Sequence, residues 1–65
     1  MENSYNLNPD TATMIAEGVE EVETEEEYIA AWQYLIDTGL CWRLQGWFGR
    51  TAARLIDDGY CTRAK

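Results

Sequence analysis

Apolar residues recur at helical spacing in two segments of the chain, and no segment alternates apolar and polar residues as a β-strand does. The first segment, residues 25–38, repeats apolar side chains at intervals of one, three and four residues: Tyr28, Trp32, Leu35 and Ile36. The second segment, residues 46–58, has an apolar face of Phe48, Ala52, Leu55 and Ile56. We therefore expect an all-α protein built on a small helical hairpin.

Start and stop signals frame these two helices. Thr24 and Glu27 match a capping box, in which the threonine oxygen accepts from the third helical amide and the glutamate reaches back to the cap. Gly39 stands where a helix commonly ends in the left-handed conformation, and Gly59 does the same for the second helix.

A short helix over residues 9–17 is predicted ahead of the hairpin. Asn8 is a good N-cap, Pro9 suits the first helical position, and Gly18 ends the segment. The predicted organisation has three parts: an acidic N-terminal extension (1–23), a helical hairpin domain (24–61) and a tail (62–65).

Charge is divided unevenly along the chain. Residues 1–42 contain ten acidic residues and no basic one, whereas residues 43–65 contain five basic and two acidic residues. The halves therefore carry −10 and +3 within a net charge of −7. The glutamate-rich run predicts a solvated linker that steers the protein toward a basic surface. The residues expected to provide this steering are Glu20, Glu21, Glu23, Glu25 and Glu26.

The residues that most enzymes need are scarce. The chain has no histidine, its one lysine is Lys65, and no glycine-rich phosphate loop follows a strand. We therefore expect no catalytic site, no metal and no cofactor. Cys41 and Cys61 are expected to be reduced thiols that pack as small apolar groups, and a disulfide between them is the alternative.

Three tryptophans are more than a hairpin of this size covers comfortably. Either Trp32, Trp42 and Trp47 form one aromatic cluster, or one indole is exposed as the anchor of an interface. In the second case, the contact surface that we favour is Trp42 with Arg43, or Trp47 with Arg50.

Two glycines lie close together in the second helix of the hairpin. Each costs about 1 kcal/mol relative to alanine inside a helix, which suggests a geometric need. We interpret Gly46 as part of the helix start and Gly49 as a site of close packing against Trp32. The alternative is a smooth notch where a partner helix or ligand approaches.

Arg50 and Arg54 are four residues apart and share one helix face. We expect them to pair with Asp57, Asp58 or the acidic residues of the first hairpin helix. A nucleic-acid recognition face that also uses Gln45, as in a helix-turn-helix protein, is the alternative. The overall acidity of the chain disfavours that alternative.

Several blocks of the chain resemble a family of small, uncharacterised bacteriophage proteins. The resemblance covers residues 24–61 and is carried by AWQYLIDTGL at 31–40, Trp42, LQG at 44–46, Gly49-Arg50, Leu55-Ile56, Gly59 and Cys61. It implies a phage origin and a helical fold, and it transfers no catalytic residue.

The expected function is that of a non-enzymatic phage protein that binds and modulates a host macromolecule in the host cytoplasm. No apolar run approaches the roughly 20 residues that cross a bilayer, and the N-terminus lacks a secretion signal. A host protein is the expected partner, without membrane or nucleic acid. The alternatives are a self-assembling homo-oligomer and either a DNA mimic or a small nucleic-acid-binding regulator.

Overall fold

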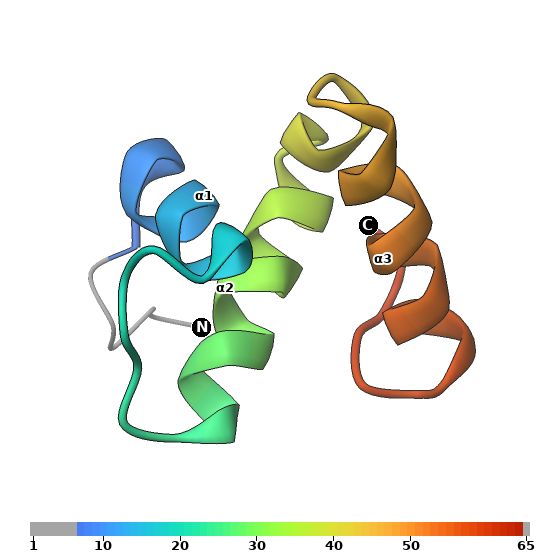
Figure 1. Cartoon of the computed structure of the whole chain (residues 1–65). Helices are drawn as coiled ribbons and strands as arrows, with labels where there is room; N and C mark the ends of the chain where they lie inside the picture. The colour runs from blue at the N-terminus through green and yellow to red at the C-terminus, as the bar shows by residue number, and fades with distance from the viewer. Residues whose placement is uncertain (1–6, 65) are drawn as a thin grey trace.

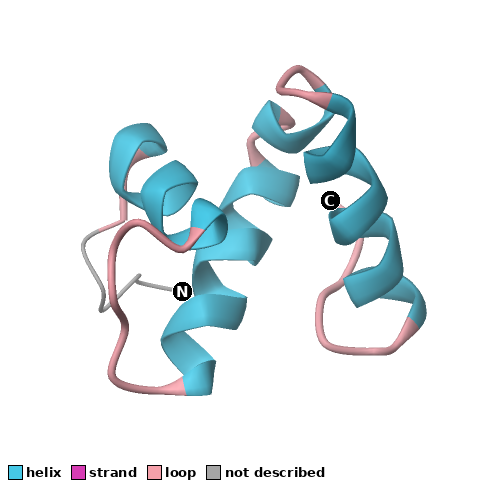
Figure 2. Cartoon of the chain, viewed as in Figure 1, coloured by secondary structure: helices cyan, strands magenta, loops and turns pink. Residues whose placement is uncertain are grey.

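A computed structural model describes residues 7–64 and contains four helical elements. These are α1 (Pro9–Glu17), α2 (Glu25–Asp37), the short 3₁₀ helix η1 (Leu40–Trp42) and α3 (Gly46–Asp57). Figure 2 shows no strand in this part of the chain, which confirms the all-α class. The predicted helices over residues 9–17, 25–38 and 46–58 agree with the observed bounds to within one residue.

The first two helices begin at the caps that the sequence predicts. The Asn8 Oδ1 atom accepts a hydrogen bond of 2.8 Å from the amide of Thr11, and Thr24 Oγ1 accepts one of 3.2 Å from Glu27. The reverse half of the capping box differs from the expected one, because Glu27 Oε1 accepts from the amide of Glu23, at 3.4 Å. The glutamate therefore pairs one residue further upstream than the motif prescribes.

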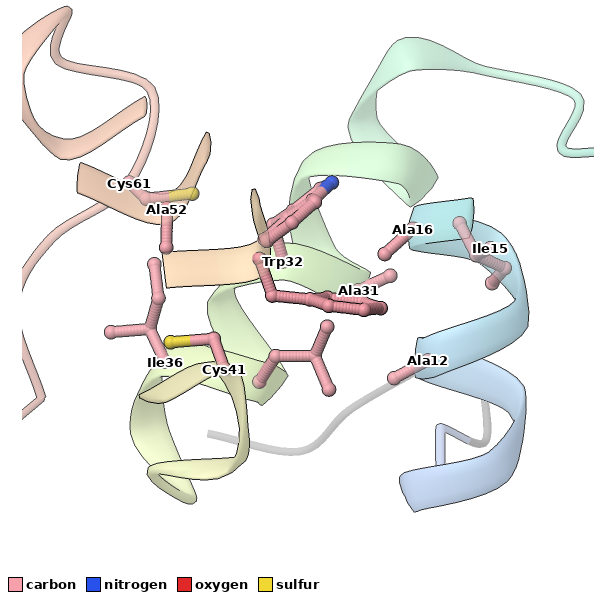
Figure 3. Close-up of a cluster of buried hydrophobic side chains, with 11 residues drawn as sticks. Ala12, Ile15, Ala16, Ala31, Trp32, Ile36, Cys41, Ala52 and Cys61 are labelled. Carbon is pink, nitrogen blue, oxygen red and sulfur yellow. The ribbon is translucent and has the colours of Figure 1, made fainter. Parts of the chain in front are cut away.

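Helix α2 passes through the middle of the molecule, with α1 on one side and α3 on the other (Figure 1). Small residues let α1 and α2 approach closely: Ala12 and Ala16 of α1 and Ala31 of α2 are all buried, beside Ile15. Figure 3 shows these alanines facing one another. Helix α1 is thus part of the core that the hairpin shares, whereas the sequence analysis placed it in an extension outside the hairpin.

Bulkier side chains fill the space between α2 and α3. Trp32 and Ile36 from α2 are buried with Ala52 from α3 (Figure 3). Phe48 of α3 is buried as well, with its ring centroid 6.0 Å from that of Trp32. Aromatic side chains bury about 150–250 Å² each, so Trp32 and Phe48 contribute a large share of the apolar area in this core. One continuous core therefore runs from α1 through α2 to α3.

The residues after α3 return to α2 and are fastened there. The side-chain amide of Gln33 donates to the carbonyl of Thr62 at 2.8 Å and accepts from the amide of Thr62 at 2.9 Å. Cys61 is buried beside this pair. The predicted tail over residues 62–65 is therefore anchored at its first residue, and Lys65 lies outside the described residues.

Candidate functional site

The turn between α2 and α3 directs the Cys41 side chain into the core and the next side chain, Trp42, toward solvent. Gly39 ends α2 with a left-handed φ of 80°, and η1 follows directly. Consecutive side chains of a 3₁₀ helix point about 120° apart. Cys41 accordingly lies in the core, 1% exposed, whereas Trp42 is 53% exposed. The outward direction of Trp42 follows from this 3₁₀ turn, which the sequence did not predict.

The Trp42 ring lies against α3 at Gly49. A Cβ atom at position 49 would stand 3.3 Å from Cε3 and 3.6 Å from Cζ3 of the indole. The first of these distances is tighter than most Cβ contacts, so the glycine allows the ring to rest on the helix backbone. The expectation that Gly49 makes room for Trp32 is therefore wrong: the neighbouring ring is that of Trp42.

Trp47, the other candidate anchor, belongs to the core cluster. Its ring stacks on Phe48 with centroids 3.9 Å apart and meets Trp32 edge-on at 6.3 Å. The side chain is half-buried. Trp32 is fully buried, and its Nε1 atom has no hydrogen-bond partner among the described residues. Of the two arrangements considered for the three indoles, the structure shows a cluster of two, with the third exposed.

The first turn of α3 lacks the stabilising groups found in the other helices. Gln45 occupies the N-cap position but makes no side-chain capping bond, and the turn contains no acidic residue. The Arg50 side chain folds back over Gly46, where a Cβ atom would stand 3.1 Å from its Nη1 atom. A cation therefore lies near the positive end of the helix dipole, where an anion is favoured.

The remaining predicted contact residues are exposed, some at this turn and Arg54 in the last turn of α3. Arg50 and Arg54 line a shallow depression with Thr51, and Arg43 and Gln45 are exposed. Neither Arg50 nor Arg54 forms an ion pair within 4.0 Å with any residue between 7 and 64, so the expected pairing with Asp57 or Asp58 is not present. We define the junction surface as Trp42, Arg43, Gln45, Arg50 and Arg54.

The acidic residues expected to steer a partner are all exposed: Glu20, Glu21, Glu23, Glu25 and Glu26. They differ in their surroundings. Glu25 and Glu26 line an apolar surface groove with Ile29, Ala30 and Tyr60, whereas the other three precede α2. Of these five residues, Glu25 and Glu26 are the two that line the groove.

The roles of Gln33 and Tyr60 were not predicted from the sequence, in which Tyr60 was expected only to form an apolar clasp with Cys61 after the second hairpin helix. The Gln33 amide fastens a backbone segment 29 residues away and also donates to Asp37 Oδ1 at 2.9 Å. Tyr60 is 56% exposed and forms one wall of the groove. Neither role has a local sequence signal, because each depends on where residues 60–62 return to α2.

The two cysteines are free and buried. Burial raises the pKa of both thiols, and the carboxylate of Asp37 raises the pKa of Cys61 further. Both are therefore protonated near neutral pH, and they pack as small apolar groups. Within residues 7–64, no three histidine, cysteine or carboxylate side chains converge as metal ligands would. No helix in this part of the chain is long and apolar enough to span a membrane.

Comparison with curated proteins and with solved structures gave no match. A family model described as "Domain of unknown function (DUF7417)" matches residues 11–65. The match includes most of α1 together with α2 and α3, which is the set of helices that share the core. The chain therefore belongs to the DUF7417 family.

Proposed function

We propose that this protein is a non-enzymatic binding protein that contacts another protein through the junction surface. The observation that carries the proposal is Trp42, which exposes half of its area on a fixed turn. Tryptophan and arginine are the residues most enriched at interface hot spots, and this surface presents both.

The folding of the chain does not account for an exposed indole at this position. Cys41, Leu40 and Leu44 already cover the end of the core around the turn. One side of the ring rests on α3 at Gly49, which limits its movement toward the helix and reduces the conformational freedom lost when a partner covers it. Trp42 therefore suits an anchor that inserts into an apolar pocket of a partner.

The charges around Trp42 indicate the chemistry of that partner. Arg43 follows Trp42 in the chain, and Arg50 follows Gly49, against which the Trp42 ring lies. Arg54 is one turn further along α3, in a depression that it shares with Arg50, and the first turn of α3 has amides without a side-chain cap. Carboxylates are stabilised both by arginine and by a helix N-terminus. We expect the partner to present an apolar pocket bordered by aspartate or glutamate.

The resemblance to phage proteins suggests where the partner is found. On this hypothesis the chain acts in the host cytoplasm, where it binds and modulates a host protein. The excess of acidic groups in residues 1–42 then disfavours nucleic acid and limits nonspecific binding.

The test is affinity capture from a bacterial host lysate with the wild type and Trp42→Ala, followed by mass spectrometry. We expect at least one protein to be captured by the wild type and lost with Trp42→Ala. Trp42 is the appropriate position because substitution of Trp47 also removes the stack on Phe48.

Val19→Ala is the matched control, because Val19 is a more exposed apolar side chain, 69% accessible, on the loop after α1. It is expected to retain the captured protein. A double variant, Arg50→Glu with Arg54→Glu, is expected to lose it. The same set of captured proteins with all four chains would contradict the proposal, as would a set lost only with Val19→Ala.

A further inference from the structure

A second surface lies at the other end of the α2–α3 pair. The apolar groove is lined by Ile29, Ala30 and Tyr60, and Glu25 and Glu26 stand at its rim. Figure 1 shows the start of α2 and the segment after α3 at one end of the molecule, and η1 at the other. The groove and the junction surface are therefore separate sites.

The wall formed by Tyr60 is held on both sides by backbone contacts. Before it, Gly59 adopts a left-handed φ of 89°, and the Tyr60 amide donates to the carbonyl of Leu55 at 2.9 Å. After it, Cys61 is buried, and Thr62 makes its two bonds to Gln33. The phenol ring is thus exposed on a fastened segment, so the groove exists before any ligand binds.

We infer that this groove binds an arginine side chain carried by a basic segment of a partner protein. The aliphatic stem of an arginine packs along Ile29 and Ala30, its guanidinium meets the carboxylates of Glu25 and Glu26, and Tyr60 offers an aromatic face. Arginine buries its stem on apolar surface while its head pairs with carboxylates or stacks on a ring. The groove is thus proposed to bind a basic side chain, whereas the junction surface is proposed to bind acidic side chains.

The charge balance of the chain favours a foreign partner over a second copy. Residues 1–42 carry −10, whereas residues 43–65 of another copy carry only +3 and the whole copy carries −7. Association of two copies through the groove therefore leaves most of the acidic charge uncompensated. A partner richer in arginine or lysine relieves that repulsion and is attracted over longer distances.

The probe is a capped hexapeptide of alternating arginine and leucine, titrated into isotopically labelled full-length protein and followed by NMR. Chemical-shift changes are expected to centre on Glu25, Glu26, Ile29, Ala30 and Tyr60. A capped hexapeptide of alternating lysine and leucine, which has the same charge, is expected to bind at least about threefold more weakly because lysine lacks the planar guanidinium that pairs with two carboxylates and stacks on an aromatic ring.

Two double variants distinguish binding in the groove from a general effect of negative charge. Glu25→Gln with Glu26→Gln is expected to weaken binding about tenfold, because each charge-assisted bond contributes a few-fold or more. The matched control is Glu20→Gln with Glu21→Gln, which removes the same charge outside the groove and is expected to weaken binding less than about threefold. Tyr60→Ser, which leaves α2 unchanged, is expected to weaken binding about fivefold.

Equal losses in the two double variants would overturn the proposal, because the acidic run would then act only through its total charge. Shift changes centred on Trp42, or no shift changes at all, would also overturn it. Sedimentation of the protein without peptide tests whether a second copy binds in the groove. If the protein self-associates and Glu25→Gln with Glu26→Gln abolishes that association, a second copy occupies the groove and the proposal is overturned. Trp42→Ala is expected to bind the peptide normally, so this result is independent of the junction surface.

Discussion

The first turns of α2 and α3 differ in the groups that stabilise their free backbone amides. The first turn of α2 has a threonine cap and three glutamates, all of which stabilise a helix N-terminus. The first turn of α3 has an uncapped glutamine, no acidic residue and an arginine folded over it. The groups at the α2 start stabilise that helix, whereas the α3 start has fewer stabilising groups and leaves backbone donors and cations exposed. On the proposed function, the junction surface accounts for that difference.

The largest expected contrast is between two tryptophans of the same chain. Trp32→Ala should lower the free energy of unfolding by about 3–5 kcal/mol, because it leaves a large cavity at the centre of the core. Trp42→Ala should lower it by less than about 1 kcal/mol, because its ring is half in water. Urea unfolding followed by circular dichroism measures both. Comparable losses in the two variants would show that Trp42 is a core residue.

The start of α2 gives the next effect in size. Thr24→Ala should cost about 1 kcal/mol of unfolding free energy, because the amide of Glu27 loses its capping oxygen. Thr24→Ser keeps that oxygen and should restore most of the loss. An unchanged unfolding midpoint for Thr24→Ala would mean that the cap contributes nothing and that the two helix starts are energetically alike.

The smallest effect on stability is expected at Gly49. Gly49→Ala gains up to about 1 kcal/mol of helix propensity, which is offset by the tight contact with the Trp42 ring, so the unfolding free energy should change by less than about 1 kcal/mol. The ring is half-exposed and has room to move outward. Capture of the partner should therefore fall although the fold is retained. Full capture by Gly49→Ala would show that the position of the indole is unimportant.

Local signals in the sequence were sufficient to predict the helices. Asn8 before Pro9, the threonine cap at residue 24 and the glycine at residue 39 each act within a few residues, and each has the predicted role. The direction of the tryptophans could not be predicted in this way. It depends on the tight turn of η1 and on which ring meets α3, and both are tertiary features.

Contacts between distant segments were likewise beyond the sequence analysis. The Gln33–Thr62 pair joins residues 29 positions apart, and the groove beside Tyr60 exists only because this pair and Cys61 hold the segment on α2. The packing of α1 was missed for a related reason: small alanines give little hydrophobic signal in a sequence, yet they allow the closest helix approach in the molecule. The residues of the junction surface were all named from the sequence and are exposed, whereas Trp47 packs against the core; their role in binding stays a prediction.

The most direct measurement of the central claim uses Gln45→Asp, which adds a capping carboxylate to the start of α3. We predict that the free energy of unfolding rises by about 0.5–1 kcal/mol, because the first turn gains a cap and an anion near the dipole and Arg50. We also predict that capture of the partner falls, because the added carboxylate occupies the place of a partner's acidic group. A variant that is no more stable than the wild type, or one that is more stable and still captures the partner fully, would contradict the account.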